Sequence, residues 1–203
     1  MQYIYLKKSW KAFSGSLLLL NNGFQEFDGD DNANGTSDLQ TIGSHIDYKK
    51  GKLGLAGNIF LQTGKRQGDI SVKGAYLAGL DVNYKAFDKV ILGVGTEVIS
   101  GNDADAGETG AFFPLYGTNH KFNGFMDYFY VGNHANSIGL FDLHASAIFK
   151  FKNKARLLVK VLNFSGEQEL ATGNKSLGTE IDLVFTKPIK AGKLKIGYSH
   201  MFA

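Results

Sequence analysis

The chain has 203 residues, a formal net charge of +3 and no cysteine, which excludes disulfide frameworks and thiolate metal sites. Its 22 Lys and Arg and 19 Asp and Glu are spread evenly along the sequence, a pattern that argues against a nucleic-acid partner. The longest aliphatic run, Leu17 to Leu20, is far shorter than the roughly 20 residues of a membrane-spanning helix. Glycine is abundant and proline rare, which together with many Phe, Tyr and β-branched residues favours a strand-rich fold.

Alternation of apolar and polar residues predicts about ten strands. It is clearest in the segment containing Leu80, Asp81 and Val82, where successive side chains would point to opposite faces. In chain order the predicted strands are Gln2–Trp10, Phe13–Phe27, Leu39–Lys49, Leu53–Gly64, Val72–Lys85, Val90–Ser100, Phe141–Phe151, Ala155–Ser165, Leu177–Phe185 and Lys193–His200.

The connections between these strands alternate in predicted length. Short turns are expected at Lys11–Ala12, Lys50–Lys52, Asp88–Lys89, Lys152–Lys154 and Pro188–Gly192, and long polar loops at Asp28–Ser37, Lys65–Ser71, Gly101–Ile138 and Gly166–Ser176. Aromatic residues, among them Trp10, Tyr48 and Phe87, flank the short turns. Tight turns at one rim, long loops at the other and an aromatic girdle are typical of β-barrels in the outer membrane of Gram-negative bacteria.

We therefore predict an all-β fold, an antiparallel up-and-down transmembrane β-barrel that contacts outer-membrane lipid. The alternative is a soluble lipocalin-like barrel that carries a small ligand, because its strands alternate in the same way. The polar face favours the membrane barrel. It is rich in small residues such as Gly79, Gly93 and Gly95 mixed with charged ones, which a water-filled interior tolerates.

The number of strands predicts that residues 1–203 form one barrel segment that is incomplete at both ends. With short turns in the periplasm, the first strand would begin and the last would end on the outer side, whereas complete barrels begin and end in the periplasm. We expect at least one further strand at each end and an export signal. The same parity leaves no place for a strand at Phe125–Gly132, so residues 101–138 are predicted to form one outer loop that folds into the barrel.

This loop contains the sequence Leu115-Tyr116-Gly117-Thr118-Asn119-His120-Lys121-Phe122-Asn123-Gly124, followed by Phe125-Met126-Asp127. It resembles a loop in the alginate-export family of outer-membrane porins. The segments Leu20–Phe24 and Gly197–Ala203 are similar to the same family. The resemblance covers most of this chain but only the C-terminal part of such a porin, and it implies a larger barrel that passes an anionic polysaccharide.

The predicted polar face carries the candidate pore-lining residues, which include nearly equal numbers of basic and acidic groups. They are Lys73, Asp81, Lys85, Glu97, Asp142, His144, Lys150, Arg156, Lys160, Glu180, Asp182 and Lys195. The candidate constriction residues in the long loop are Tyr116, Asn119, His120, Lys121 and Asp127. A dedicated polyanion channel should have a clear basic surplus, so this balance favours a general pore for hydrophilic solutes.

Catalytic and metal-binding interpretations are weaker. His120, Asp127 and His134 lie in one loop but lack the spacing of a paired-ligand or acid–base site, so we expect no enzymatic activity, cofactor or metal there. Asp30-x-Asn32-x-Asn34-Gly35 matches the start of a calcium loop. Thr41 occupies the position at which that motif requires Glu, which favours a solvated acidic loop.

Overall fold

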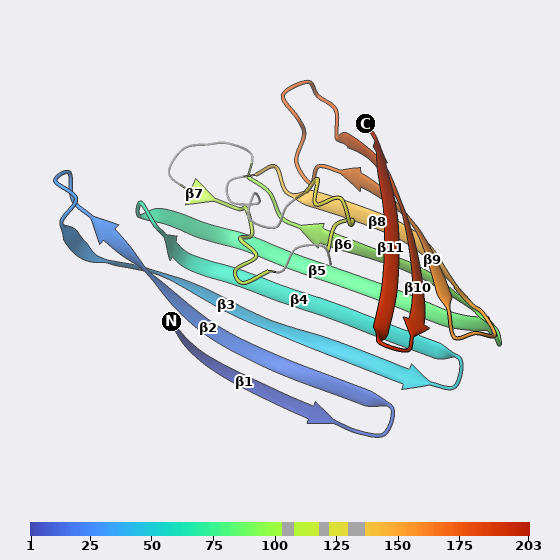
Figure 1. The fold of residues 1–203 in the computed structure, drawn as a ribbon. Helices are drawn as coiled ribbons and strands as arrows, with labels where there is room; N and C mark the ends of the chain where they lie inside the picture. Colours follow the sequence, from blue (N-terminus) through green and yellow to red (C-terminus); the bar gives the residue numbers. More distant parts are fainter. Residues whose placement is uncertain (103–107, 118–121, 130–136) are drawn as a thin grey trace.

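The computed structural model describes residues 1–102, 108–117, 122–129 and 137–203, and Figure 1 shows them as one curved antiparallel sheet. The strands are β1 (Gln2–Ser9), β2 (Phe13–Phe27), β3 (Ala33–Lys50), β4 (Leu53–Arg66), β5 (Ile70–Phe87), β6 (Val90–Ile99), β7 (Glu108–Thr109), β8 (Leu140–Lys150), β9 (Arg156–Ser165), β10 (Ser176–Ile189) and β11 (Gly192–Phe202). Among these residues, no helix has the length and apolar composition to cross a membrane.

The sheet is a meander in which each long strand pairs with the next one in the chain. Its order is β1-β2-β3-β4-β5-β6-β8-β9-β10-β11, so the predicted all-β, ten-strand antiparallel arrangement is confirmed. One element was missed: β7 lies within the predicted loop and pairs in parallel with β5. Two residues are too short to produce a recognisable alternation, which is why the sequence does not reveal this strand.

The predicted lengths of two connections at the long-loop rim were wrong. β2 ends at Phe27 and β3 begins at Ala33, while β4 ends at Arg66 and β5 begins at Ile70, so both connections are tight. Here β3 begins with polar residues on both faces, such as the successive residues Thr36 and Ser37, whose side chains point to opposite faces. The alternation of apolar and polar residues stops in this region, but the backbone hydrogen bonds between the paired strands continue to the turns.

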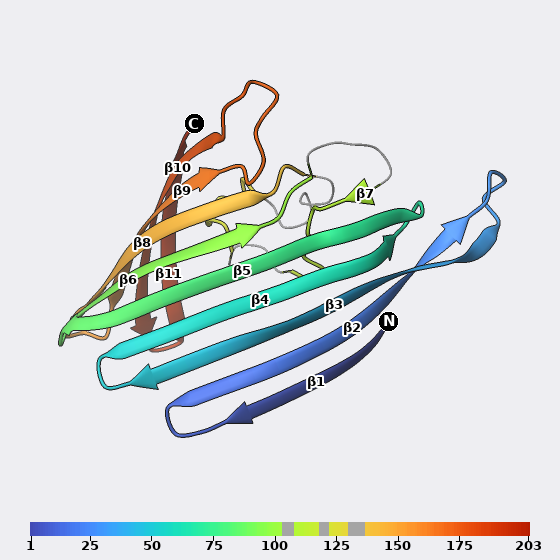
Figure 2. The same cartoon turned by 180° about the vertical axis from the view of Figure 1, so that it is seen from behind.

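The two faces of the sheet differ as the alternation predicts. Leu80 and Val94 lie on the outer face with exposed fractions of 49% and 57%, and in Figure 2 no described segment covers β2–β6 on this side. The buried cluster that includes Leu39, Leu162 and Phe164 lies on the concave face. The soluble-carrier alternative requires Leu80 and Val94 to be enclosed in a core, and they are exposed.

Aromatic side chains lie at the ends of the strands beside the short turns. Trp10, Phe87 and Phe151 are exposed by 54%, 70% and 48%, and the Trp10 ring is 5.4 Å from that of Phe13. The ammonium group of Lys8 lies 5.2 Å from the centre of the Trp10 ring. Rings at one level with a cation beside them fit a boundary between an apolar and an aqueous phase.

Candidate functional site

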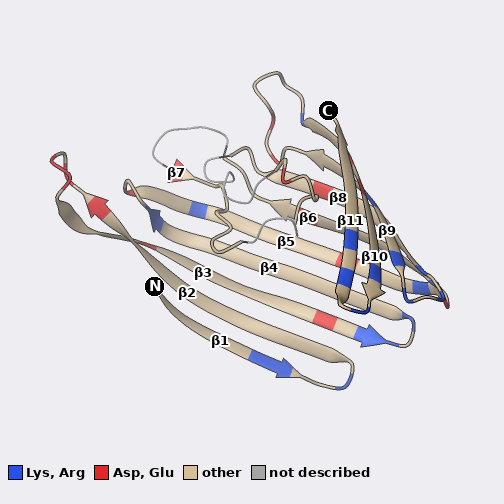
Figure 3. Ribbon diagram, in the orientation of Figure 1, with Lys and Arg blue, Asp and Glu red and all other residues tan. Residues whose placement is uncertain are grey.

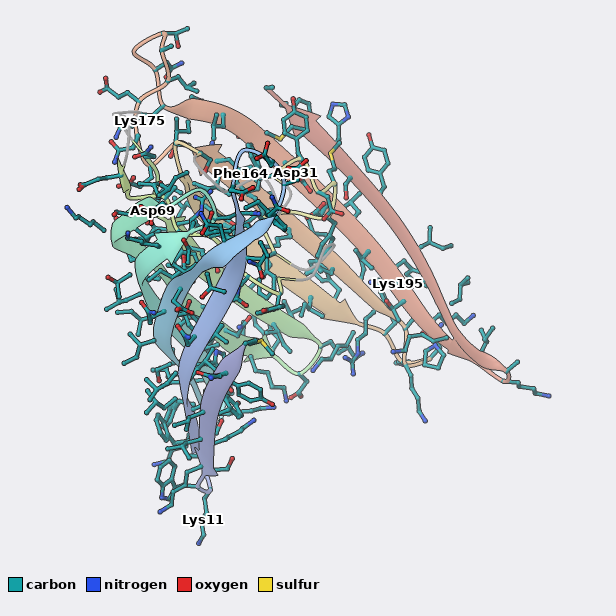
Figure 4. All side chains as sticks on the ribbon, turned by 90° about the vertical axis from the view of Figure 1, so that its left-hand side faces the viewer. Lys11, Asp31, Asp69, Phe164, Lys175 and Lys195 are labelled. Carbon is teal, nitrogen blue, oxygen red and sulfur yellow. The ribbon has the colours of Figure 1, made fainter. Side chains whose placement is uncertain are left out.

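The described parts of the long connection between β6 and β8, residues 108–117 and 122–129, lie against the concave face; we call them the inner loop (Figures 1 and 4). Gln62 on β4 holds its first part. The Gln62 amide donates to the carbonyl oxygen of Phe113 and accepts from the Phe113 N–H, both at 2.8 Å. Gln62 is only 3% exposed, so water has little access to this contact. The two hydrogen bonds therefore satisfy the N–H and C=O groups of Phe113, which belong to no strand.

The second part of the inner loop is held by two carboxylates from strands far apart in the sheet. Asn123 donates from Nδ2 to Glu97 on β6 at 3.1 Å. Glu180 on β10 accepts from the backbone N–H groups of Phe125 and Met126 at 2.7 and 3.1 Å. The loop therefore crosses the concave face between β6 and β10. The Phe129 ring adds a contact with the Phe164 ring, with centroids 4.6 Å apart.

Gly124 is required by this arrangement. Its φ of +89° is a conformation that residues with a side chain rarely adopt, and a Cβ there would lie 2.4 Å from Oε2 of Glu180. The Asn-Gly pair thus lets the backbone approach the carboxylate closely enough for the next two N–H groups to bind it.

A histidine between two carboxylates lies beside the inner loop. His144 on β8 contacts Asp142 through Nδ1 at 3.0 Å and Asp81 through Nε2 at 2.9 Å. Gly95, the register partner of His144, leaves the space for this pair, because a Cβ there would lie 2.4 Å from Nε2. The sequence predicts that the glycines of this face border a water-filled interior; at Gly95 the space is filled by polar side chains of Asp81 and His144 from the neighbouring strands.

Glu180 and Asp182 form a second acidic pair, on β10. Both side chains are fully buried, and their carboxyl groups lie beside each other. Asp182 accepts a short hydrogen bond from the Ser199 hydroxyl on β11. Oε2 of Glu180 and Oδ2 of Asp182 have no hydrogen-bond partner among the described residues. Lys160 on β9 is the register partner of Asp182, so this basic candidate pore-lining residue lies beside the acidic pair.

The remaining basic candidates lie toward the two ends of the strands. Lys85 forms an ion pair with Asp88 at 2.9 Å in the β5–β6 turn. Lys150, Arg156 and Lys195 lie at the short-turn end of β8, β9 and β11. Lys73, near the opposite end of β5, is paired with Glu108 of β7. Register places ten of the twelve candidate pore-lining residues on the concave side of the sheet, the side that carries the inner loop. Lys73 and Lys85 lie at register shifts of β5 and have no register partner in the described sheet.

The candidate constriction residues are only partly described. Tyr116 donates its hydroxyl to Asn22 on β2, and Asp127 lies in the part of the loop that Glu180 holds, with a φ of +55°. Asn119, His120 and Lys121 lie outside the described residues, as does His134.

Three residues that hold the inner loop were not predicted from the sequence: Gln62, Asn22 and Asn123. Only Asn123 had a usable signal, because Asn-Gly is a common turn pair.

The turn at Asp28 also differs from the calcium-loop pattern. Asp28 accepts from the N–H groups of Asp30 and Asn32, both at 2.9 Å, and so closes the turn itself. The backbone donors of Asn32 and Asp30 hold the pKa of the Asp28 carboxyl below its usual value. The carboxylate that closes this turn, Asp28, therefore lies before the first residue of the calcium-loop match, Asp30.

Comparisons with known proteins give a match in structure only. No known protein-family model matches the sequence, and no curated protein matches it significantly. Among solved structures, the fold is similar to that in the crystal structure of Acinetobacter baumannii OccAB4, an outer-membrane channel, with a TM-score of 0.54 and 18% sequence identity. The match covers 98% of this chain and 53% of OccAB4, so the chain spans about half of that protein. None of these comparisons assigns the chain to the alginate-export family, and that resemblance stays a prediction.

Proposed function

We propose that the protein is a porin-like channel of the outer membrane of a Gram-negative bacterium, which passes hydrophilic solutes without chemical change. The uncovered outer face carries this proposal, because Leu80 and Val94 are exposed on it while buried carboxylates lie on the other face. Other large apolar side chains, such as Ile42, Ile59 and Leu92, are also exposed. Soluble monomers rarely expose so many large apolar side chains together. The likeness in fold to an outer-membrane channel supports the proposal.

In this proposal further strands close the sheet into a barrel. β1 and β11 are the two edges of the described sheet, and each pairs there with one neighbour. Bare backbone N–H and C=O groups in hydrocarbon cost several kcal/mol each, roughly the strength of an unreplaced hydrogen bond, so an edge in lipid needs a partner. Residues 1–203 would then be one segment of a larger barrel.

The inner loop would form the constriction of this pore, and the twelve candidate pore-lining residues would line its wall. The hydrogen bonds to Gln62, Glu97 and Glu180 support this role because they fix the loop across the face. The loop resemblance to alginate-export porins extends the proposal to an anionic polysaccharide as a solute.

An arginine substitution on each face tests the assignment. Leu80→Arg should cost roughly 2 to 4 kcal/mol near the bilayer midplane and reduce assembly of the protein expressed from its complete gene. The matched control is Asn83→Arg, on the concave face of the same strand, which should assemble normally. Heat-modifiable mobility and protease resistance in outer-membrane fractions report assembly. Normal assembly of Leu80→Arg would overturn the outward assignment.

A further inference from the structure

A cavity of about 440 Å³ opens on the concave side at the short-turn end of β8–β11. Four cationic side chains line it, Lys150, Lys154, Arg156 and Lys193, and none of its described lining residues is acidic. Lys150 is the register partner of Arg156, which in turn is opposite Thr186. Opposed residues of an antiparallel pair have Cβ atoms about 4.5 to 5.5 Å apart, so these side chains share one small area.

No acidic side chain among the described residues pairs with the cationic groups of this cavity. Like charges directly opposite each other destabilise a sheet, and Lys150 faces Arg156 in this way. Within the described part of the chain none of the four forms an ion pair, whereas nearby Lys85 is paired with Asp88. Lys154 is held at the rim by its N–H, which donates to the Phe151 carbonyl oxygen at 3.1 Å.

The cavity lies at the end of the sheet where lysines are concentrated, whereas several acidic residues lie toward the opposite end. Each of the five short turns has a lysine in it or at its border, as Figure 3 shows in blue. Figure 4 places Lys11 at this end of the molecule and Asp31 and Asp69 at the opposite end. The buried carboxylates of Glu180 and Asp182 lie further along β10, toward the long-loop rim. The short-turn end of the sheet therefore carries a concentration of positive charge, which attracts anions.

We infer that this cavity is a binding site for a small, multiply charged oxyanion such as a phosphate group. Several cations around one such anion offset their mutual repulsion, and the planar guanidinium of Arg156 can donate two parallel hydrogen bonds to its oxygens. The Thr186 hydroxyl adds a neutral donor. A singly charged carboxylate would neutralise less of the charge. The inference rests on the proposed function only in treating this end of the sheet as a pore mouth that solutes reach.

Titration calorimetry of the folded protein in detergent tests the site directly, with inorganic phosphate at pH 8 as the probe. Acetate at the same ionic strength is the control for screening. We expect binding of phosphate and about tenfold weaker binding of acetate. The double variant Lys150→Gln/Arg156→Gln should bind phosphate about a hundredfold more weakly, since it loses two charge-assisted contacts and each corresponds to about a factor of ten. The matched control, Lys65→Gln/Lys175→Gln, removes two lysines from the long-loop rim and should keep the parent affinity.

The inference is overturned by the absence of phosphate binding in the parent, by equal affinities for phosphate and acetate, or by an unchanged affinity in the Lys150/Arg156 variant. Circular dichroism of each variant confirms that it is folded. The assay requires no transport, so its failure is distinct from failure of the channel proposal. Conversely, normal assembly of Leu80→Arg would remove the channel and leave the anion site standing.

Discussion

Removing the Glu180 carboxylate should release the second part of the inner loop. In Glu180→Ala, the N–H groups of Phe125 and Met126 lose their shared acceptor, Oε1 of Glu180, which lies at 2.7 and 3.1 Å from them. Hydrogen bonds to charged groups contribute about 1.5 to 3 kcal/mol each, so the two together hold the loop with roughly 3 to 6 kcal/mol. Glu180 also lies beside Asp182 and leaves Oε2 without a partner among the described residues, which offsets part of this gain. We therefore take the lower end, about 3 kcal/mol.

Amide hydrogen exchange measures this release residue by residue. A loss of about 3 kcal/mol corresponds to a roughly hundredfold faster exchange of the Phe125 and Met126 amides. Glu180→Gln is the matched control, because it keeps an acceptor oxygen for both amides and can donate to Asp182. Exchange in this control should stay close to that of the parent. Unchanged protection of both amides in Glu180→Ala would refute the role assigned to Glu180.

Three further predictions test other contacts of the concave face. Gly124→Ala should speed exchange of the same two amides, because its Cβ would lie 2.4 Å from Glu180 Oε2; unaltered exchange would contradict the close approach. Gly95→Ala should lower the free energy of unfolding by about 1 to 3 kcal/mol by displacing His144, whereas Gly54→Ala, with its nearest atoms at 3.9 Å, should not; equal urea midpoints would contradict this. The turn at Asp28 should loosen in acid: the pKa of this carboxyl is lowered by folding, so its stabilisation is present above the usual pKa and is lost as the pH falls through the lowered value. A lower protection factor of the Asp30 and Asn32 amides at low pH, corrected for the pH dependence of intrinsic exchange, would show this, and a pH-independent protection factor would contradict it.

The sequence predicts the sheet well because one physical signal dominates it. A strand with lipid or an apolar phase on one side and polar groups on the other must alternate, and the segment around Leu80 and Asp81 does so throughout. The signal fails where both faces are polar, which is why β3 starts at Ala33 and not at the predicted Leu39. It also fails within the inner loop, where order depends on partners distant in sequence: Phe113 binds Gln62, and Phe125 binds Glu180.

Charge distribution is a second property that the sequence hides. Lysines spread evenly along the chain become concentrated at one end because a meander returns to the same rim at every second connection. Lys11, Lys52 and Lys89 are far apart in sequence but occupy equivalent turns of the sheet. A count of basic and acidic residues on the polar face is therefore nearly balanced, while their positions along the strands are not.

The carboxylates of the concave face and the inner loop depend on each other. A loop that lies on a sheet face cannot use the ladder for its own N–H groups, and unpaired buried donors are costly, so it needs acceptors that project from the strands. Glu97 and Glu180 supply them from β6 and β10. In return, the loop gives these carboxylates donors in a place that is largely shielded from water. The width of the proposed pore would then be set by side chains on the wall, and a change at Glu180 would alter both the charge of the wall and the position of the loop.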